Sequence, residues 1–198
     1  VSAGRFFVFG KHDQSKVPEK VIGLLIEASM AFGTGHHGTT KGCLIAINEL
    51  IDEKYSPRKV VDIGCGTAVL AMAVGKVWDC KIIATDIDPV AIEVTKANLI
   101  ANRLEHKIIC IIADGISNSK ILETAPFDLI FANILKGPIL KMAEDLSQSC
   151  SLNGIIILSG ILNEQSNEVL ELYQEKKFKL INEISIEGWT TLKMRKVI

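Results

Sequence analysis

The chain has 198 residues, 48% of them hydrophobic, so it is long enough to bury one large core and too short for two ordinary domains. Its 22 basic and 23 acidic side chains give a formal net charge of -1. No domain-wide positive field therefore draws the chain to nucleic acid or to an anionic membrane, and tight nucleic-acid binding is unsupported.

The five cysteines stand singly and mostly inside apolar segments, at Cys43, Cys65, Cys80, Cys110 and Cys150. They form no C-x-x-C pair and have no histidine at ligand spacing, which is typical of core residues in a reducing cytosol. The longest apolar runs, 21–26 and 108–113, are far shorter than a membrane span. We therefore expect a soluble, cytoplasmic protein with no metal site and no membrane partner.

The first thirty residues contain two β-prone segments, 5–9 and 21–26, separated by a polar run that includes Pro18. This pattern predicts a hairpin, or a strand with a long loop. Residues 30–40 hold three glycines in six positions and no helical periodicity, which indicates a flexible loop. A helix follows, and Thr39 or Thr40 can cap it. Its apolar face is predicted at Cys43, Leu44, Ile47, Leu50 and Ile51.

The segment 59–89 carries the strongest functional signal. A short β-branched strand ends at Asp62, Gly64 and Gly66 form a tight turn, and an apolar run at helical spacing follows. A second strand ends in Asp86, at the distance where an acid can bind the two hydroxyls of a ribose held over the turn. The unit therefore predicts a nucleoside site.

Departures from the dinucleotide-binding pattern narrow the choice of ligand. Val69 stands where a third glycine or an alanine would let the helix close on the strand. Acids at the predicted strand ends, namely Asp62, Asp86, Asp88 and Asp114, would repel a pyrophosphate. A ligand with an ammonium, a sulfonium and a ribose but no phosphate suits this edge, so we predict S-adenosylmethionine as the cofactor. The alternative is that 62–66 is only a tight turn before a core helix.

The glycine-rich loop 30–40 directly precedes the first strand of this unit. It is placed to fold over the ligand, with backbone amides and threonine hydroxyls facing the polar atoms of the ligand. His36 and His37 could instead suggest a metal pair, but adjacent residues do not converge on one ion and no third ligand is in view. We prefer the interpretation as a lid.

Strands and helices alternate after Asp86. Asp88 is a natural N-cap, with Pro89 at the first helical position. The buried stripe of this helix is predicted at Val90, Val94, Ala97 and Ala101. The strand 107–112 leads to Asp114, which can either reach the exocyclic amine of a base or cap the following turn, and both interpretations stay open.

The last part of the chain supplies the remaining strands. Strand 127–132 runs into Asn133, and Pro138 begins a helix. That helix is predicted to bury Ile139, Met142, Ala143 and Leu146. A strand at 155–158 that ends before Ser159-Gly160, a helix at 164–175 and a hairpin of 178–187 and 189–197 complete the chain. The predicted fold is an α/β three-layer sandwich with a mostly parallel sheet.

The Asp62-x-Gly64-x-Gly66 turn, the acid at Asp86 and the terminal hairpin resemble the class I S-adenosylmethionine methyltransferases. Within that class, four stretches resemble the bacterial methyltransferase family of ribosomal large-subunit protein L-eleven, namely 31–40, 86–89, 132–135 and 158–162. The resemblance covers nearly the whole chain, and it implies a Rossmann-like sheet of seven strands, one of them antiparallel. It also implies methyl transfer to lysine amino groups of the ribosomal protein, with the N-terminal amine as a second candidate.

The resemblance assigns residues to this site. It implies that Thr40, Gly64, Asp86 and Asn133 bind the cofactor and that Phe32, Thr34 and Gly66 line the same site, while the strand-end pattern adds Asp62 and Asp114. Asn133 is also the candidate catalytic residue, because its side chain can accept a hydrogen bond from the attacking amine, with the Ile134 carbonyl as a second acceptor. The alternative is an asparagine that only caps the next helix.

Two departures from the family pattern affect these expectations. The commoner lid reads Gly-Thr-Gly-Thr-His-Pro-Thr-Thr, whereas His36 here replaces the threonine and Gly38 the proline, which predicts a looser loop. The family also has an N-terminal domain that recognises the ribosomal protein, and we expect this chain to lack it. We expect a catalytic domain, with 1–30 as its leading segment and 31–198 as the methyltransferase domain, that methylates poorly without the recognition domain.

Three other functions stay open. The acceptor of an N-methyltransferase could be another protein or a small molecule. A nicotinamide-dependent oxidoreductase is disfavoured by Val69 and by the acidic edge of the sheet. A non-catalytic interaction domain is disfavoured because Thr34, Thr40 and Asn133 are all present.

Overall fold

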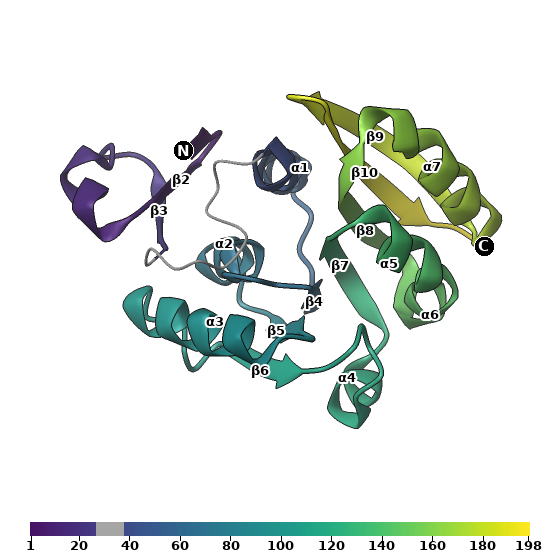
Figure 1. Ribbon diagram of the computed structural model, residues 1–198, viewed down its shortest axis with the longest axis horizontal. Coiled ribbons are helices and arrows are strands. Elements are labelled where there is room, and N and C mark those ends of the chain that lie inside the picture. Colours follow the sequence, from purple (N-terminus) through teal and green to yellow (C-terminus); the bar gives the residue numbers. More distant parts are fainter. Residues whose placement is uncertain (27–37) are drawn as a thin grey trace.

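The structure, a computed structural model, describes residues 1–26 and 38–198 as a large sheet with helices on both faces and a small sheet near the N-terminus (Figure 1). Most of the predicted loop 30–40 lies outside the described residues. The same holds for Phe32, Thr34, His36 and His37.

The large sheet has seven strands and the small sheet has three. The small sheet consists of β1 (Ser2–Ala3), β2 (Phe6–Phe9) and β3 (Ile22–Leu25). The large sheet has, in spatial order, β6 (Ile108–Ile112), β5 (Lys81–Asp86), β4 (Lys59–Ile63), β7 (Phe127–Asn133), β8 (Cys150–Leu162), β10 (Trp189–Lys196) and β9 (Phe178–Ile186). Strand β10 is antiparallel to β8 and β9, and the pairs from β6 to β8 are parallel. The predicted fold class is confirmed.

The helices of the described residues cover both faces of the large sheet. They are α1 (Gly38–Asp52), α2 (Val69–Val77), α3 (Pro89–Ala101), α4 (Ser119–Thr124), α5 (Lys136–Lys141), α6 (Ala143–Ser149) and α7 (Ser166–Glu175), with short 3-10 turns η1 (Lys11–Lys16) and η2 (Asn163–Gln165). Figure 1 shows α1, α2 and α3 on one side of the sheet and α5, α6 and α7 on the other.

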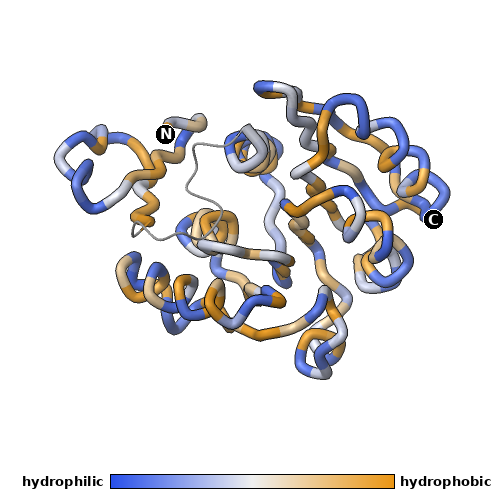
Figure 2. The backbone as a smooth tube through the Cα atoms, in the orientation of Figure 1, coloured by the Kyte–Doolittle hydropathy of each residue, from blue (hydrophilic) through white to orange (hydrophobic). Residues whose placement is uncertain are grey.

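Alternation along the central strands explains these three layers. Val60 and Leu129 pack into the core beneath α1 to α3, whereas their neighbours Val61 and Ile130 pack into the core beneath α5 to α7. Strands that are buried on both faces are mostly apolar between their ends, and Figure 2 shows hydrophobic residues in them.

The small sheet does not contain the hairpin that the sequence suggested. Strands β2 and β3 are parallel, with Phe6 opposite Ile22, and the turn η1 lies in the connection between them. A parallel pair needs a crossover and cannot be closed by a tight turn, so the long polar run around Pro18 serves as that crossover. The antiparallel partner of β2 is β1.

The start of α1 also differs from the prediction. Thr39 and Thr40 both lie inside the first turn, so neither is the N-cap. Gly38 is already helical, and a Cβ there would lie 2.6 Å from the Ile186 carbonyl oxygen. The predicted inner face is confirmed for Cys43, Leu44, Ile47 and Leu50, while Ile51 is partly buried.

Helix α3 is capped as predicted but buries a different face. The Asp88 side chain accepts from the Val90 N–H at 2.9 Å, with Pro89 in the first turn. The predicted stripe of Val90, Val94, Ala97 and Ala101 is wrong, because Val90 is 67% exposed. The buried residues of α3 are Ala91, Ile92, Thr95, Asn98 and Leu99.

Polar side chains on the buried face of α3 explain why its apolar pattern misled the prediction. The Thr95 hydroxyl donates to the Gly66 carbonyl at 2.9 Å, and the Asn98 amide donates to the Thr67 carbonyl at 3.0 Å. Directly after the helix, the Asn102 side chain donates to the Leu25 carbonyl at 2.7 Å and accepts from the Leu25 N–H at 3.0 Å. Helix α3 therefore holds both the glycine turn and strand β3.

Two element boundaries in the second half of the chain also shift. The helix predicted to begin at Pro138 begins at Lys136 and is divided at Met142 into α5 and α6. All four residues of its predicted inner face are buried. Strand β8 is much longer than 155–158 and continues through Ser159 and Gly160.

We predict that Asn102→Leu lowers the free energy of unfolding by about 1–3 kcal/mol, because it leaves the Leu25 N–H and C=O without these partners in a partly buried contact. Urea unfolding followed by circular dichroism measures the change. The control is Asn167→Leu on the exposed side of α7, which should change stability by no more than about 0.5 kcal/mol. Equal losses for both variants would contradict this role of Asn102.

Candidate active site

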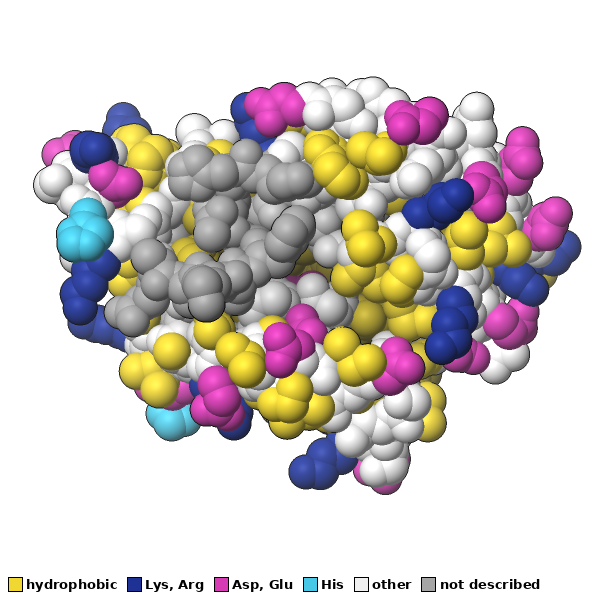
Figure 3. All heavy atoms as spheres, viewed as in Figure 1, with side chains coloured by type: hydrophobic (Ala, Val, Ile, Leu, Met, Phe, Trp, Pro, Cys, Tyr) yellow, Lys and Arg dark blue, Asp and Glu magenta, His cyan; other side chains and the backbone are white. Residues whose placement is uncertain are grey.

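A cavity of about 460 Å³ opens at the carboxyl ends of β4, β5 and β7. Its lining combines acids, glycines and apolar side chains: Thr39, Thr40, Asp62, Ile63, Gly64, Cys65, Gly66, Val69, Leu70, Asp86, Ile87, Ala113, Asp114, Gly115, Asn133, Ile134, Leu135, Pro138, Met142, Gly160 and Trp189. Figure 3 shows hydrophobic and acidic side chains next to one another around the hollow at the centre of this face. The cavity lies at β4, where the strand order reverses between β5 on one side and β7 on the other, the usual ligand position in such sheets.

The floor of the cavity is the turn between β4 and α2. Gly64 and Gly66 have φ of +65° and +54°, which only glycine adopts readily. A Cβ at Gly64 would overlap the side chain of Ile134. The Cys65 N–H donates to the Thr85 carbonyl at 3.0 Å, which fastens the turn to β5.

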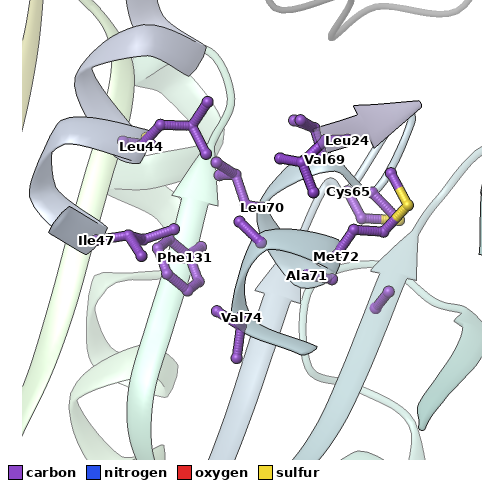
Figure 4. Close-up of a cluster of buried hydrophobic side chains, with 14 of the residues drawn as sticks. Leu24, Leu44, Ile47, Cys65, Val69, Leu70, Ala71, Met72, Val74 and Phe131 are labelled. Carbon is purple, nitrogen blue, oxygen red and sulfur yellow. The ribbon is translucent and has the colours of Figure 1, made fainter. Parts of the chain in front are cut away.

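Val69 occupies the position where dinucleotide sites carry a glycine or alanine. Its side chain is 3% exposed and lies in the same buried cluster as Leu24 of β3 and Leu44 of α1 (Figure 4). The start of α2 therefore packs against the small sheet and α1.

Asp86 is fixed by two backbone N–H groups at the end of β5. Its Oδ2 accepts from Gly66 N–H at 2.9 Å and its Oδ1 accepts from Asp88 N–H at 3.0 Å. The carboxylate is thus oriented before any ligand binds, and each oxygen retains a lone pair for a hydroxyl donor. Two neighbouring ribose hydroxyls are the donors that this geometry suits.

Asp62 is the most deeply buried acid in the site, with 1% of its surface exposed. Its pKa is raised to about 7, chiefly by burial; a hydrogen bond from the Ala71 N–H at 3.0 Å opposes the rise, and the nearby Asp86 charge contributes to it. A cation bound in the cavity would favour the charged form of Asp62.

Asn133 ends β7 and faces the first turn of α1. Its side-chain nitrogen donates to the Thr40 hydroxyl at 3.4 Å, which leaves the amide oxygen as an acceptor. The N-cap of α5 is Leu135, so the alternative in which Asn133 only caps that helix is wrong. The next residue, Ile134, donates its N–H to the Ser159 carbonyl at 3.1 Å.

The structure brings seven of the nine predicted site residues to this cavity: Thr40, Asp62, Gly64, Gly66, Asp86, Asp114 and Asn133. Phe32 and Thr34 lie outside the described residues. Asp114 lies beside the cavity, and its backbone carbonyl, not its side chain, accepts from Ser117 N–H in the following turn. The role of each residue remains a prediction.

Sequence reasoning missed the apolar part of the lining. Ile87 and Leu135 are 66% and 68% exposed at the cavity, and Met142 and Trp189 reach it from distant parts of the chain. Ile87 could have been predicted as a lining residue, because it directly follows Asp86. Met142 was assigned to the core, and nothing local in the sequence distinguishes Trp189.

Two negative findings apply to residues 1–26 and 38–198. That part of the chain contains no group of three or more His, Cys, Asp or Glu side chains placed to hold a metal ion. It also contains no helix that is both long and apolar enough to cross a membrane.

The strand order, the single antiparallel strand β10, the glycine turn after β4 and the acid at the end of β5 define the class I S-adenosylmethionine-dependent methyltransferase fold. The sequence profile described as ribosomal protein L11 methyltransferase (PrmA) matches residues 1–197. The chain belongs to the ribosomal protein L11 methyltransferase family.

Individual relatives agree with this assignment. The chain is 42% identical over 195 residues to the ribosomal protein L11 methyltransferase of Mesorhizobium japonicum, covering 98% of this chain and 67% of the relative. It is 40% identical over 196 residues to that of a Caulobacter species, covering 99% and 67%. The chain thus spans about two thirds of the length of these relatives.

Solved structures support the fold. The crystal structure of a ribosomal protein L11 methylase from Lactobacillus delbrueckii superposes with a TM-score of 0.86 at 24% identity, covering 98% of this chain and 96% of that one. A precorrin-6y C5,15-methyltransferase from Geobacter metallireducens gives a TM-score of 0.65 at 11% identity, with 78% and 88% covered.

We predict that Asp86→Ala weakens S-adenosylmethionine binding by about 1–3 kcal/mol, because charge-assisted hydrogen bonds are lost and the glycine turn loses its anchor. Titration calorimetry measures the affinity. The matched control is Asp88→Ala, which removes the cap of α3 and should lower stability by about 0.5–2 kcal/mol. Because Asp88 does not line the cavity, its loss should change affinity much less. Equal affinity in the wild type and Asp86→Ala would remove Asp86 from the site.

We predict that S-adenosylmethionine binding releases a proton from Asp62 at pH values below about 7, so that affinity rises between pH 5.5 and 7. The stability of the free protein depends on pH with the opposite sign. Folded Asp62 keeps its proton up to about pH 7, whereas unfolded Asp62 loses it near pH 3.8. The contribution of Asp62 to the free energy of unfolding therefore falls as pH rises from 3.8 toward 7. Calorimetry in two buffers of different ionisation enthalpy counts the protons. Asp62→Asn should abolish the release, and an unchanged proton count in that variant would exclude Asp62 as its source.

Proposed function

We propose that this protein transfers methyl groups from S-adenosylmethionine to amino groups of ribosomal protein L11, on lysine side chains and at the N-terminal amine. The observation that most directly supports this proposal is the position of Asn133. It lines the cavity beside the glycine turn, and it contacts Thr40 through its side-chain nitrogen and not through its amide oxygen. Family membership supports the choice of reaction and of acceptor.

The residues of the cavity fit this cofactor. The carboxylates of Asp62, Asp86 and Asp114 suit its ammonium, ribose and exocyclic amine, and the apolar lining around Ile87 and Met142 suits a base. The turn at Gly64 and Gly66 presents backbone to the cavity at positive φ, and a Cβ at Gly64 would overlap the Ile134 side chain. We propose Thr40, Asn133 and, from the resemblance, Phe32 and Thr34 as the remaining contacts.

The cofactor supplies a methyl group that is already electrophilic because it is bonded to a sulfonium. The protein must therefore mainly place a neutral amine in line with the S–CH3 bond. A lysine amine has a reference pKa of about 10.4, so it must first lose a proton to water, and the partly apolar rim that includes Leu135 favours its neutral form. The amine nitrogen then bonds to the methyl carbon while the S–C electron pair stays on sulfur.

Asn133 is the proposed catalytic residue. Its amide oxygen accepts a hydrogen bond from one N–H of the amine, and the Ile134 carbonyl is the acceptor for the second, so the single lone pair of the nitrogen points at the methyl group. The donor side of the same amide is held by Thr40, which fixes the orientation of the oxygen.

The proposal has consequences for location and for the organisation of the chain. An enzyme that modifies a ribosomal protein would act in the cytoplasm. We propose that 1–30 is the leading segment of the methyltransferase domain at 31–198. In support, Phe6 and Leu24 of the small sheet are fully buried in the same core as α1 and α2.

Methylation of purified ribosomal protein L11 tests the function. The protein is incubated with S-adenosylmethionine and L11, and intact-mass spectrometry followed by peptide mapping locates the added methyl groups. Slow growth of the L11 mass in whole methyl units, on lysine and N-terminal nitrogens, is the expected result. Methylation of another protein or a small amine, with L11 left unmodified, would contradict the assignment of L11 as the acceptor.

We predict that Asn133→Ala lowers kcat by about one to three decades, because a group that orients the amine is lost. The affinity for S-adenosylhomocysteine should fall much less, since the glycine turn and Asp86 remain. Asn133→Asp keeps an acceptor oxygen and should retain part of the activity. The control Asn182→Ala removes a contact with Glu49 away from the cavity and should leave kcat near the wild-type value. Equal changes in affinity and kcat for Asn133→Ala would make Asn133 a cofactor ligand only.

A further inference from the structure

Strand β8 departs from regular pairing directly beside Asn133. Ile161 pairs with Thr190 and Leu158 with Leu192, so Ser159 and Gly160 together lie opposite Thr191 alone. This is a β-bulge, and its second residue, Gly160, has φ of +83°. β-Bulges beside active sites change the direction in which nearby side chains point, so the contacts between this bulge and the cavity bear on function.

Gly160 allows the backbone of Ile134 to lie close against β8. A Cβ at position 160 would overlap the Ile134 carbonyl oxygen and lie 2.7 Å from its carbonyl carbon. The Ile134 side chain lies against Gly64 on the other side, where a Cβ would also overlap it. Ile134 is therefore confined between the bulge and the cofactor turn, and the absence of a side chain at 160 sets where its carbonyl lies.

Ser159 acts on the first turn of α1. It is the register partner of Asn133 on the neighbouring strand. Its fully buried hydroxyl lies 3.3 Å from the Thr39 carbonyl and 2.8 Å from the Thr191 hydroxyl. Asn133 itself contacts Thr40, the next residue of that turn. Two paired residues of β7 and β8 thus contact two consecutive residues of α1.

Thr191 limits how closely α1 can approach the sheet. Its hydroxyl lies beneath Gly42, where a Cβ would overlap it, so the helix can approach β10 only because residue 42 is glycine. Figure 1 places α1 next to β8 and β10, and the two strands pack against it. The Ser159 and Thr191 hydroxyls therefore form a link between the sheet and the turn that carries Thr40.

We propose that Ser159, Gly160 and Thr191 are positioning residues for methyl transfer: the hydroxyl pair sets Asn133 through Thr39 and Thr40, and Gly160 sets the Ile134 carbonyl. The proposal rests on the function proposed above, in which both oxygens orient the acceptor amine. A purely structural role would alter stability alone. A positioning role alters kcat while cofactor affinity is largely kept, because Asp86 and the glycine turn do not depend on this link.

The main variant is Thr191→Val, which removes the hydroxyl and nearly preserves the volume. We expect a roughly tenfold loss of kcat toward L11, little change in the dissociation constant of S-adenosylhomocysteine, and rescue of kcat by Thr191→Ser. The matched control is Thr124→Val on α4, whose hydroxyl donates to the Lys120 carbonyl and which is not among the residues that line the cavity. It should leave kcat unchanged even where it lowers the melting temperature.

A double-mutant cycle separates action through Asn133 from a general loss of structure. If Thr191 acts through Asn133, Thr191→Val should have almost no further effect on kcat in an Asn133→Ala background. An equal loss of kcat in both backgrounds, or unchanged kcat in an active enzyme, would overturn the proposal. Gly160→Ala should lower kcat in either background, because it displaces the Ile134 carbonyl.

A readout that needs no turnover distinguishes failure of this inference from failure of the proposed function. The side-chain amide NMR signals of Asn133 should shift in Thr191→Val and return toward the wild-type position in Thr191→Ser, with Thr124→Val as the unshifted control. Wild-type protein that leaves L11 unmodified would refute the proposed function, and the NMR comparison would still decide whether the hydroxyl pair positions Asn133. Unchanged Asn133 signals in Thr191→Val would refute the inference.

Discussion

The hydrogen bond from the Gly66 N–H to Asp86 joins the two halves of the cofactor side of the site. It fixes the turn after β4 to the end of β5 and, together with the Asp88 N–H, it orients the Asp86 carboxylate. The α3 side chains Thr95 and Asn98 hold the opposite, carbonyl side of the same turn. With both sides of its backbone held, the turn keeps positive φ angles without any help from a ligand.

The proposed acceptor side is built on a different set of strands. Asn133 and Ile134 lie where β7 ends, and the bulge in β8 and the first turn of α1 contact them from either side. The glycine turn after β4 and the end of β7 meet where the Ile134 side chain lies against Gly64. Methyl transfer depends mainly on the relative position of donor and acceptor, so this contact couples the two parts that the reaction must align.

Much of this arrangement was predictable because short-range chemistry determines it. The glycine turn, the acids at strand ends and the Asp88 cap each follow from a few adjacent residues, and the resemblance to a family supplied Asn133 and Thr40. The face of α3 was not predictable from hydropathy, since its buried side includes polar residues whose partners lie on other elements. The parallel pairing of β2 and β3 and the bulge opposite Thr191 are long-range features that no local pattern signals.

The central claim is that an acidic, partly apolar cavity at the ends of β4 and β5 selects a sulfonium nucleoside over a phosphate-bearing one. Titration calorimetry with S-adenosylmethionine and with NAD, each alone and in competition, tests it most directly. The account predicts binding of one S-adenosylmethionine per chain that NAD does not displace. Tighter binding of NAD than of S-adenosylmethionine would contradict it.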